Sequence, residues 1–331
     1  MIYLWEVQIL LKDEVLCILE RKIGTIVTGG QLAISLNVSR NAIWKAIHSL
    51  QKNGVQIVSI PHIGYKLLDS NDTLSKILIN SKLSTTFIGN QLEILPSVHS
   101  TNQYLKEISN ANIENGFVAI ANEQTQGRGR RGREFVSARD EGIYLSILLK
   151  LNIHQRDIRL LTICAAVAVA KAIENVCKID AKIKWVNDIY CNGKKICGIL
   201  TEAILSGELQ ELDAVIIGIG INTGDVPFAI KEFATSVREE NGMCGIRNHL
   251  IAEVLTQFEA IYIDYAMNDK TYEIIQYYES NLFIKGQQVV VMDSGNEYIA
   301  TVLGVDNTGA LIVKDTNSNI QHLVTGEIRI K

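Results

Sequence analysis

Four arginines lie within the seven residues Gly127–Arg133, which read Gly-Arg-Gly-Arg-Arg-Gly-Arg. The segment satisfies the GxGxxG pattern of a dinucleotide-binding turn, but that turn requires a strand before it and a helix after it. Residues 134–137 and 142–147 are instead typical of extended chain. Because guanidinium groups match phosphate and carboxylate oxygens in paired hydrogen bonds, we predict an anion-binding loop. A basic surface loop is the simpler alternative.

A lysine follows in an apolar strand pattern. Lys182–Tyr190 is predicted to be one strand, with Lys194–Leu200 as its hairpin partner across an Asn192–Gly193 turn. A lysine in such a strand either extends its ammonium group to the edge of the sheet or uses it to bind an anion. Considered by itself, Lys195 would be interpreted as a structural residue. Beside an arginine loop it becomes a candidate for stabilising negative charge on a transferring phosphoryl group.

Uncharged polar side chains occur in three further segments. Ser100-Thr101-Asn102 opens a predicted helix, where Ser100 or Thr101 could simply be the cap, and Gln124 precedes the arginine loop. Such groups suit a neutral ureido or amide ligand, because a ligand that lacks the matching group leaves them unpaired. Asn222 follows a Gly-Ile-Gly-Ile run and could bind a base edge, although a tight turn explains that run equally well.

The N-terminal part predicts a winged helix-turn-helix. Three helical patterns and two strand patterns fall at residues 11–19, 32–36, 40–50, 55–60 and 65–67. Ser39 is a good N-cap for the third helix, and the predicted DNA-facing residues are Ser39, Arg40, Asn41, Trp44, Lys45 and His48. No Asp or Glu occurs from Gly30 to Leu68, so the cations there could neutralise phosphates in a major groove. The alternative is a protein-interaction module with a solvated basic face.

Bulk composition excludes several classes of protein. The 331 residues are 47% hydrophobic and 21% charged with a net charge of −4, which indicates a globular chain of two or three domains rather than a generally basic nucleic-acid binder. Leu160–Ala170 is shorter than the roughly 20 residues that cross a bilayer, so we predict a buried helix and no membrane partner. Without a signal-peptide pattern or a CxxC pair, the six cysteines favour reduced thiols in the cytoplasm.

Residue patterns divide the chain into four predicted parts. They are a winged helix-turn-helix at 1–68, a linker helix at 69–83, a catalytic or large binding domain at 84–283 and a C-terminal β domain at 284–331. In the last part, strand patterns alternate with turns at Ser294-Gly295 and Asn307-Thr308-Gly309.

Taken together, five motifs resemble those of the biotin protein ligases, in the bifunctional form that also represses the biotin operon. The motifs are Ser-Thr-Asn at 100–102, Gln-x-x-Gly-Arg-Gly-Arg-Arg-Gly-Arg at 124–133, Lys-Trp-x-Asn-Asp at 184–188, Lys-x-x-Gly-Ile-Leu at 195–200 and Gly-x-Gly-Ile-Asn at 218–222. The resemblance covers nearly the whole chain, to the closing Gly326-Glu327-Ile328. It implies an α+β protein with a winged helix-turn-helix, a class II synthetase-like mixed α/β ligase domain and a small SH3-like C-terminal barrel.

This resemblance assigns roles to individual residues. The implied catalytic residues are Lys195, Arg130, Arg128 and Asp188. The implied biotin contacts are Ser100, Thr101, Asn102, Gln124, Arg128, Gly129, Arg130 and Lys195. The implied contacts with ATP or the adenylate are Arg131, Phe135, Asn187 and Asn222. No metal site of the chain is expected, and Mg²⁺ would arrive with ATP.

Four places depart from the family pattern. His99 stands where the family usually has Asp, Val186 where it has Pro, and Phe135 where it has Trp. The wing tip reads Pro-His-Ile-Gly-Tyr instead of Pro-Gly-Lys-Gly-Tyr, with His62 and Ile63 at the changed positions. Because no charged catalytic group is lost, we expect ligase activity to persist and DNA affinity to be the more affected property.

The resemblance implies two chemical steps. Biotin carboxylate attacks the α-phosphorus of ATP to give biotinyl-5′-AMP and pyrophosphate, and a lysine of a biotin carboxyl carrier protein then attacks the mixed anhydride. The expected partners are that carrier domain, biotin operator DNA and a second copy of the chain in a homodimer. The alternatives are a ligase whose winged helix no longer binds DNA, a biotin-sensing regulator without catalysis, and a lipoate or octanoyl transferase. The regulator should lack Lys195 or the arginine loop, and that loop with Gln124 disfavours the transferase.

Overall fold

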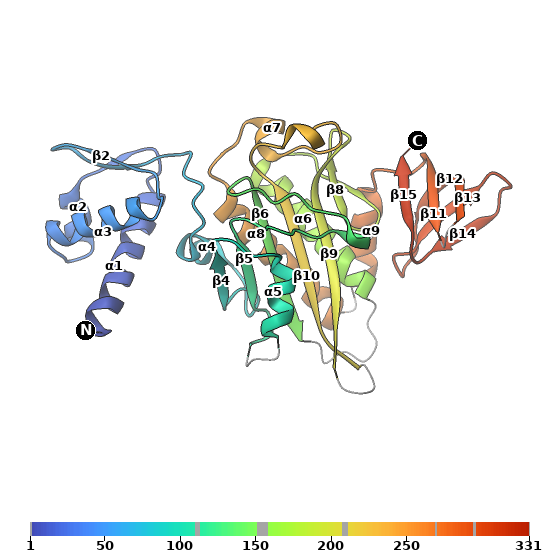
Figure 1. Cartoon of the computed structure of the whole chain (residues 1–331), viewed down its shortest axis with the longest axis horizontal. Coiled ribbons are helices and arrows are strands. Elements are labelled where there is room, and N and C mark those ends of the chain that lie inside the picture. Colours follow the sequence, from blue (N-terminus) through green and yellow to red (C-terminus); the bar gives the residue numbers. More distant parts are fainter. Residues whose placement is uncertain are drawn as a thin grey trace. The chain divides into compact units, whose positions relative to one another are not determined.

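The computed structural model forms two compact units. It describes residues 2–109, 113–150, 158–206, 211–268, 270–293 and 296–330. The first unit comprises Met1–Leu83 with Met243–Ala252, and the second comprises Ser84–Gly242 with Glu253–Lys331 (Figure 1). The division into four parts at the residue boundaries given above stays a prediction.

The first unit contains a winged helix-turn-helix. Its elements are α1 (Ile2–Glu20), β1 (Ile26–Val27), α2 (Gly29–Ser35), α3 (Arg40–Lys52), β2 (Ile57–Ile60) and β3 (Gly64–Leu67). Thr28 and Gln31 form a reciprocal capping box at the start of α2, and Ser39 accepts from the Ala42 N–H at the start of α3, as predicted. The sheet has the order β1-β3-β2, so the two predicted strands gain a third that is too short for a strand pattern to reveal.

The connector after the wing is fixed by a buried ion pair. It leads into α4 (Lys76–Lys82), and Arg247 at the start of α8 (Arg247–Met267) is only 1% exposed. The Arg247 N–H donates to Asp72 Oδ1 at 2.9 Å, and its Nε donates to the Asp72 carbonyl oxygen at 3.0 Å. Nε also lies 3.5 Å from Asp72 Oδ2. The Nε hydrogen bond and this ion pair offset the desolvation of the guanidinium, which is why a charged side chain is tolerated in this core.

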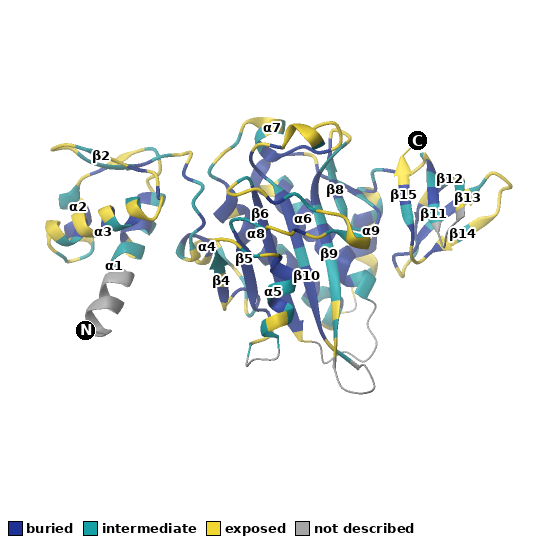
Figure 2. Cartoon of the chain, viewed as in Figure 1, coloured by how far each residue is buried: buried dark blue, intermediate teal, exposed yellow. Residues whose placement is uncertain are grey.

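The second unit is built on a seven-stranded sheet with the order β4-β5-β6-β10-β9-β8-β7, in which only β4 and β5 are parallel. The strands are β4 (Leu92–Leu95), β5 (Val118–Ala121), β6 (Gly142–Lys150), β7 (Lys182–Lys184), β8 (Asp188–Cys191), β9 (Lys194–Ser206) and β10 (Glu211–Asn222). Figure 2 shows the middle strands β6 and β10 mostly in the colour of buried residues.

One predicted strand is wrong. Lys182–Tyr190 is broken by a turn at residues 185–187, so that β7 and β8 pair with each other, with Lys184 opposite Asp188. Trp185 in this turn is buried, and its Nε1–H donates to the Gly309 carbonyl oxygen at 3.0 Å. Burial of the large indole between the sheet and a distant turn overrides the local strand pattern. The predicted hairpin across Asn192–Gly193 is confirmed, with the shorter strand β8 as the first arm and β9 as the second.

Helices α5 and α6 pack against opposite faces of the sheet. The helices of this unit are α5 (Thr101–Ile108), α6 (Ile158–Cys177), α7 (Val237–Asn241), most of α8 and α9 (Thr271–Ser280), with short 3₁₀ turns at Arg130–Gly132 and Phe228–Ile230. Asn102 of α5 contacts Glu202 of β9, and Thr162 of α6 contacts Thr201. These two strand residues are consecutive, so their side chains point to opposite faces and place the two helices on opposite sides of the sheet. Helix α6 is long and apolar enough to cross a membrane, but 72% of that apolar window is buried within the protein, as predicted for a core helix.

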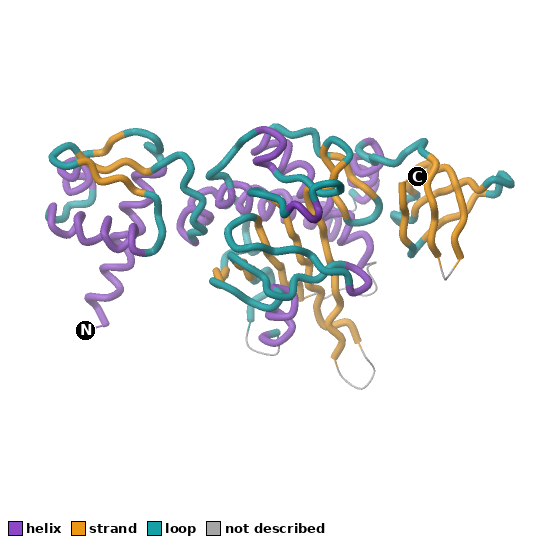
Figure 3. Tube along the Cα trace, turned by 45° about the horizontal axis from the view of Figure 1, so that its top comes forward, coloured by secondary structure: helices purple, strands orange, loops and turns teal. Residues whose placement is uncertain are grey.

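The C-terminal part is a five-stranded antiparallel sheet of order β14-β13-β12-β11-β15. Figure 3 draws it as the group of strands beside the C-terminus. Its strands are β11 (Gln288–Asp293), β12 (Asn296–Val305), β13 (Leu311–Asp315), β14 (Ile320–Leu323) and β15 (Glu327–Ile330). The predicted turn at Asn307–Gly309 is confirmed, and the Asp306 carboxylate accepts from the N–H groups of Thr308 and Ala310. The predicted turn at Ser294-Gly295 lies outside the described residues. The α+β architecture is confirmed.

Candidate active site

Two rows of paired strand residues, each with a glycine of β10 at its centre, form the floor of the site. In the first row, Gly218 of β10 pairs with Ser146 of β6 on one side and with Leu200 of β9 on the other. A Cβ atom at Gly218 would overlap Asn102, which lies over this row. In the second row, Gly220 pairs with Tyr144 and Gly198.

Phe135 lies over that second row. A Cβ atom at Gly220 would meet the Phe135 ring, and the ring also packs edge-on against Tyr144 with centroids 6.5 Å apart. Both glycines of the Gly-x-Gly-Ile-Asn motif are therefore required because other side chains of the chain lie directly on the backbone of β10.

One end of the site is polar and uncharged. Gln124 Oε1 accepts from the Thr101 N–H at 2.8 Å, while Gln124 Nε2 donates to Ser137 Oγ at 2.9 Å. Asn102 Nδ2 donates to the Leu200 carbonyl oxygen at 3.2 Å. Ser100 is the N-cap of α5 but makes no side-chain capping bond, so the helix start is held by Gln124 rather than by its own cap.

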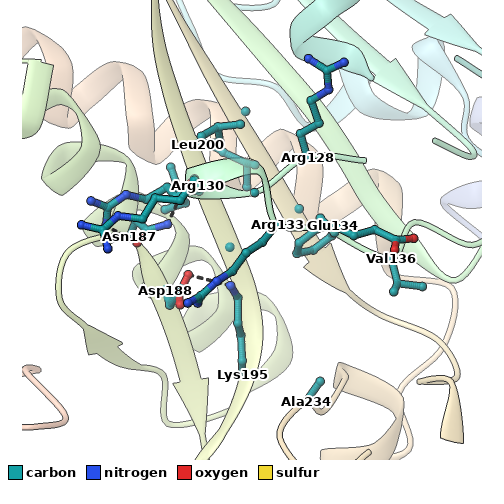
Figure 4. Close-up of a pocket in the computed structure, with 18 of the residues that line it drawn as sticks. Arg128, Arg130, Arg133, Glu134, Val136, Asn187, Asp188, Lys195, Leu200 and Ala234 are labelled. Carbon is teal, nitrogen blue, oxygen red and sulfur yellow. Dashed lines mark hydrogen bonds and ion pairs between the residues drawn. The ribbon is translucent and has the colours of Figure 1, made fainter. Parts of the chain in front are cut away.

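The other end of the site is charged. Lys195 Nζ lies 2.7 Å from Asp188 Oδ1 in a pair that is half-buried, and 6.0 Å from the centroid of the Phe135 ring (Figure 4). Arg130 NH1 donates to Asn187 Oδ1 at 3.1 Å, and Asn187 Nδ2 in turn donates to the Ile199 carbonyl oxygen at 2.7 Å. Burial lowers the pKa of Arg130, against the opposing effect of Asp188. The guanidinium is thus partly desolvated and oriented before any ligand binds.

The arginine loop is held at its far end by the C-terminal sheet. Gly129 N–H donates to the Arg133 carbonyl oxygen at 2.7 Å, and Arg131 adopts a left-handed backbone conformation with φ 56°. The guanidinium of Arg133 donates to Glu327 of β15, and Arg131 lies 3.6 Å from the same carboxylate. The hydrogen bond from Arg133 lowers the pKa of Glu327. The loop is thus anchored at residues 131 and 133 and contributes Arg130 to the site.

A cavity of about 490 Å³ joins the two ends. Every residue to which the sequence assigned catalysis, biotin or adenylate lines it; these are Ser100, Thr101, Asn102, Gln124, Arg128, Gly129, Arg130, Arg131, Phe135, Asn187, Asp188, Lys195 and Asn222. Arg128 is exposed, and Figure 4 shows its side chain pointing away from Asp188 and Lys195. Asn222 is turned to the Thr235 carbonyl oxygen, to which it donates at 2.9 Å. The individual roles stay predictions.

Sequence reasoning missed several residues of the site. Lys184 and Glu327 also line the cavity, while Ser146 and Glu202 support it from behind. Burial lowers the pKa of Lys184, whose Nζ donates to Tyr190 Oη at 3.2 Å. Lys184 and Glu327 belong to motifs given above, and those motifs could have identified them as site residues. No local sequence pattern marks Ser146 or Glu202.

The predicted DNA-facing residues share one exposed surface of α3. Ser39, Arg40, Asn41, Trp44, Lys45 and His48 are all exposed. The rings of Trp44 and His48 are stacked with centroids 5.6 Å apart, which orders two side chains on this surface. At the wing tip, Ile63 is 55% exposed beside His62.

Metal-ligand clusters do not occur among the described residues: no group of three or more His, Cys, Asp or Glu side chains converges there. The six cysteines are free, and burial raises the pKa of Cys177 to about 12. The four buried thiols therefore pack as apolar side chains; they are those of Cys164, Cys177, Cys191 and Cys197.

Known proteins are similar to the chain over most of its length. Residues 94–222 match the biotin/lipoate A/B protein ligase family, and residues 12–66 match a helix-turn-helix domain family. The chain is 33% identical over 308 residues to the bifunctional ligase/repressor BirA of Bacillus subtilis, covering 92% of this chain and 94% of that protein. It is 28% identical over 310 residues to the bifunctional ligase/repressor BirA of Escherichia coli, covering 93% and 94%. Among solved structures, the biotin protein ligase of Aquifex aeolicus in complex with biotin and ATP matches with a TM-score of 0.63 and 27% identity, over 72% of this chain and 97% of that one.

Proposed function

This chain belongs to the family of bifunctional biotin protein ligases and repressors, and on that premise we propose that it activates biotin with ATP and transfers it to a carrier-protein lysine. The observation that carries the proposal is the single cavity with an uncharged polar end at Thr101 and Gln124 and a cationic end at Arg130 and Lys195. Biotin has the same division, with a neutral ureido ring at one end and a carboxylate at the other.

Activation of biotin brings two anions together. The carboxylate attacks the α-phosphorus, an oxygen–phosphorus bond forms, and pyrophosphate leaves with the electron pair. Arg130 and Lys195 are suited to lower the repulsion between carboxylate and phosphate, because both are partly removed from water and already oriented by Asn187 and Asp188. Mg²⁺, entering as part of the nucleotide substrate, would assist the departure of pyrophosphate.

Transfer of biotin then requires an amine that has lost its proton. The carrier lysine attacks the acyl carbon, the new amide bond forms, and AMP leaves with the electrons of the broken bond. Asp188 is the candidate to hold the proton that the amine releases, since its carboxylate lies in the cavity 2.7 Å from Lys195 Nζ. The nearby Phe135 ring covers the backbone of β10 and would limit the approach of water to the adenylate.

For the first unit we propose binding to operator DNA as a homodimer. A third helix with an exposed basic face, and no acidic residue from Gly30 to Leu68, fits a major groove with phosphates on either side. Two copies would place two such helices on a two-fold symmetric operator. A ligase that has lost DNA binding is the second candidate, and the observation that favours it is the exposed Ile63 and His62 at the wing tip.

The charged residues of the cavity disfavour a regulator that only senses biotin. Such a protein would not need Lys195, Asp188 and the arginine loop around one cavity, and all are present. The free cysteines suit an enzyme of a reducing compartment such as the cytoplasm.

Incubation with ATP, labelled biotin and a carrier-domain fragment tests the ligase proposal. We expect label on the carrier only when ATP is present, and loss of label when the acceptor lysine of the fragment is changed to arginine. A chain that binds biotin but leaves the carrier unlabelled would refute it. A gel shift with operator DNA, with and without biotin and ATP, separates the repressor from the ligase that lacks DNA binding.

A further inference from the structure

The helix that is proposed to face DNA presents a large apolar side chain to the solvent. Trp44 of α3 is 54% exposed, whereas the opposite face of the helix is buried through Ile43, Ala46, Ile47 and Leu50. Exposure of a single apolar side chain is common and does not by itself mark a binding site. Two further observations, the ordering of the indole and the charges beside it, give this one a function.

The indole is ordered by the ring of His48. The two rings are parallel to within 3° with centroids 5.6 Å apart, and the residues are one helical turn apart, where side chains of a helix meet. His48 lies against one flank of the indole and leaves the rest of it accessible. An aromatic side chain that is held in place before binding loses less conformational entropy when a ligand covers it.

Positive charge lies beside this aromatic pair. Arg40 is one turn before Trp44 and Lys45 follows it directly, both exposed, and no acidic residue occurs from Gly30 to Leu68. Cationic side chains of a reading helix bind the phosphates that border the major groove. With the phosphates bound by cations, the aromatic pair between them is left to face the edges of the bases.

The major groove offers an indole only one kind of apolar partner. Base edges there present hydrogen-bond donors and acceptors, and the C5-methyl of thymine is the one apolar group. Covering a donor or acceptor with the apolar ring would remove its bonds to water without replacing them. Contact with the thymine methyl has no such cost and removes apolar surface of both partners from water.

We propose that Trp44 selects thymine in the major groove by contact with its C5-methyl group, and that His48 is a positioning residue for the indole. The inference rests on the proposed binding of the first unit to DNA. It adds to that proposal which base is read and which group of the base is recognised. Lys45 and Arg40 then supply affinity for any sequence, and Trp44 supplies a preference among sequences.

Replacement of single thymines by uracil tests this directly, because uracil keeps the hydrogen-bonding groups of thymine and lacks only the methyl. The probe is a duplex that the wild-type full chain, with biotin and ATP, enriches from DNA of random sequence. Fluorescence anisotropy then gives the Kd for each singly substituted duplex. We expect uracil to raise Kd by about fourfold at the thymine beneath Trp44, as the loss of one buried methyl group implies.

Three variants of α3 assign the effect to one side chain. Trp44→Ala, at an exposed position, should bind the thymine and uracil duplexes equally well. His48→Ala leaves the indole without its stacking partner, so the ratio of the two Kd values should fall below the wild-type ratio. Lys45→Ala is the matched control from the next position of the helix: it should weaken both duplexes alike and keep the wild-type ratio, because a phosphate contact does not sense the methyl group.

Several results would overturn the inference. A wild-type chain that binds the enriched duplex but is indifferent to uracil at every thymine would refute it and leave DNA binding intact. A wild-type ratio in Trp44→Ala would assign the methyl contact to another residue, and a wild-type ratio in His48→Ala would remove the positioning role. Failure of the wild-type chain to enrich any duplex would instead refute the proposed DNA binding, and the inference with it.

Discussion

Replacing Gly218 with alanine should weaken biotin binding without impairing the chemical steps. A methyl group at position 218 would overlap Asn102 Oδ1. Asn102 is 4% exposed and is held by Ser146, Leu200 and Glu202, so it can move only by giving up some of those hydrogen bonds. The clash therefore acts on the polar end of the cavity. The three atoms nearest to this methyl group all belong to Asn102, and the charged pair of Lys195 and Asp188 lies at the other end of the cavity.

The size of the effect follows from the bonds at risk. Loss of about two neutral hydrogen bonds is worth about 1–3 kcal/mol, which corresponds to about a 5- to 150-fold rise in Kd for biotin. Overpacking at the same place destabilises the protein by about 1–3 kcal/mol, or about 2–10 °C in Tm. Calorimetric titration with biotin and a thermal melt measure the two quantities. At saturating biotin, kcat should stay near the wild-type value because Arg130 and Lys195 are untouched.

Ile217→Val separates the site effect from general destabilisation. Ile217 is fully buried on the opposite face of β10 and does not line the cavity, and losing one methylene there costs about 0.5–1.5 kcal/mol. We expect a lower Tm with unchanged biotin affinity. The reasoning is refuted if Gly218→Ala binds biotin like the wild type, or if Ile217→Val loses a comparable amount of affinity.

Three further changes test other parts of the structure. Lys195→Ala should slow pyrophosphate release by about 10²–10³-fold while leaving thermal unfolding close to wild type, and a wild-type rate would exclude Lys195 from adenylation. For Glu327, whose folded pKa is lowered, the contact with Arg133 stabilises the protein above the ordinary carboxyl pKa and is lost as pH falls through the lowered value. Denaturant unfolding should therefore show Glu327→Gln less stable than wild type at neutral pH and equal to it in acid; a constant difference would contradict this. Lys45→Ala should weaken DNA binding at every sequence and lower the slope of log K against log salt by about one, as read by fluorescence anisotropy, whereas an unchanged slope would place Lys45 away from phosphate.

Motif order in the sequence was sufficient to predict which residues share the cavity. Lys195, Gln124 and Asn102 are far apart in the chain, yet each stood in a motif with a recognisable combination of glycine, charge and amide. The winged helix-turn-helix was equally accessible, because its apolar periodicities and the Ser39 cap are local signals.

Residues that reach the site only through strand register could not be predicted from the sequence. Ser146 is one serine in an apolar strand, and only its pairing with Gly218 brings it beneath Asn102. The break at residues 185–187 was missed because Trp185 packs against a turn that lies more than a hundred residues away. The direction of Arg128 also depends on the loop backbone, which Arg133 and Glu327 hold from the far side.

Detection of an enzyme-bound adenylate tests the central claim most directly. The chain would be incubated with biotin and ATP labelled at the α-phosphate, without carrier, and the acid-quenched products separated. We expect one labelled biotinyl adenylate per chain, matched by one released pyrophosphate, and its disappearance as AMP when carrier is added. Label that remains in ATP, or AMP released without biotin reaching the carrier, would contradict the assignment of this cavity to biotin activation and transfer.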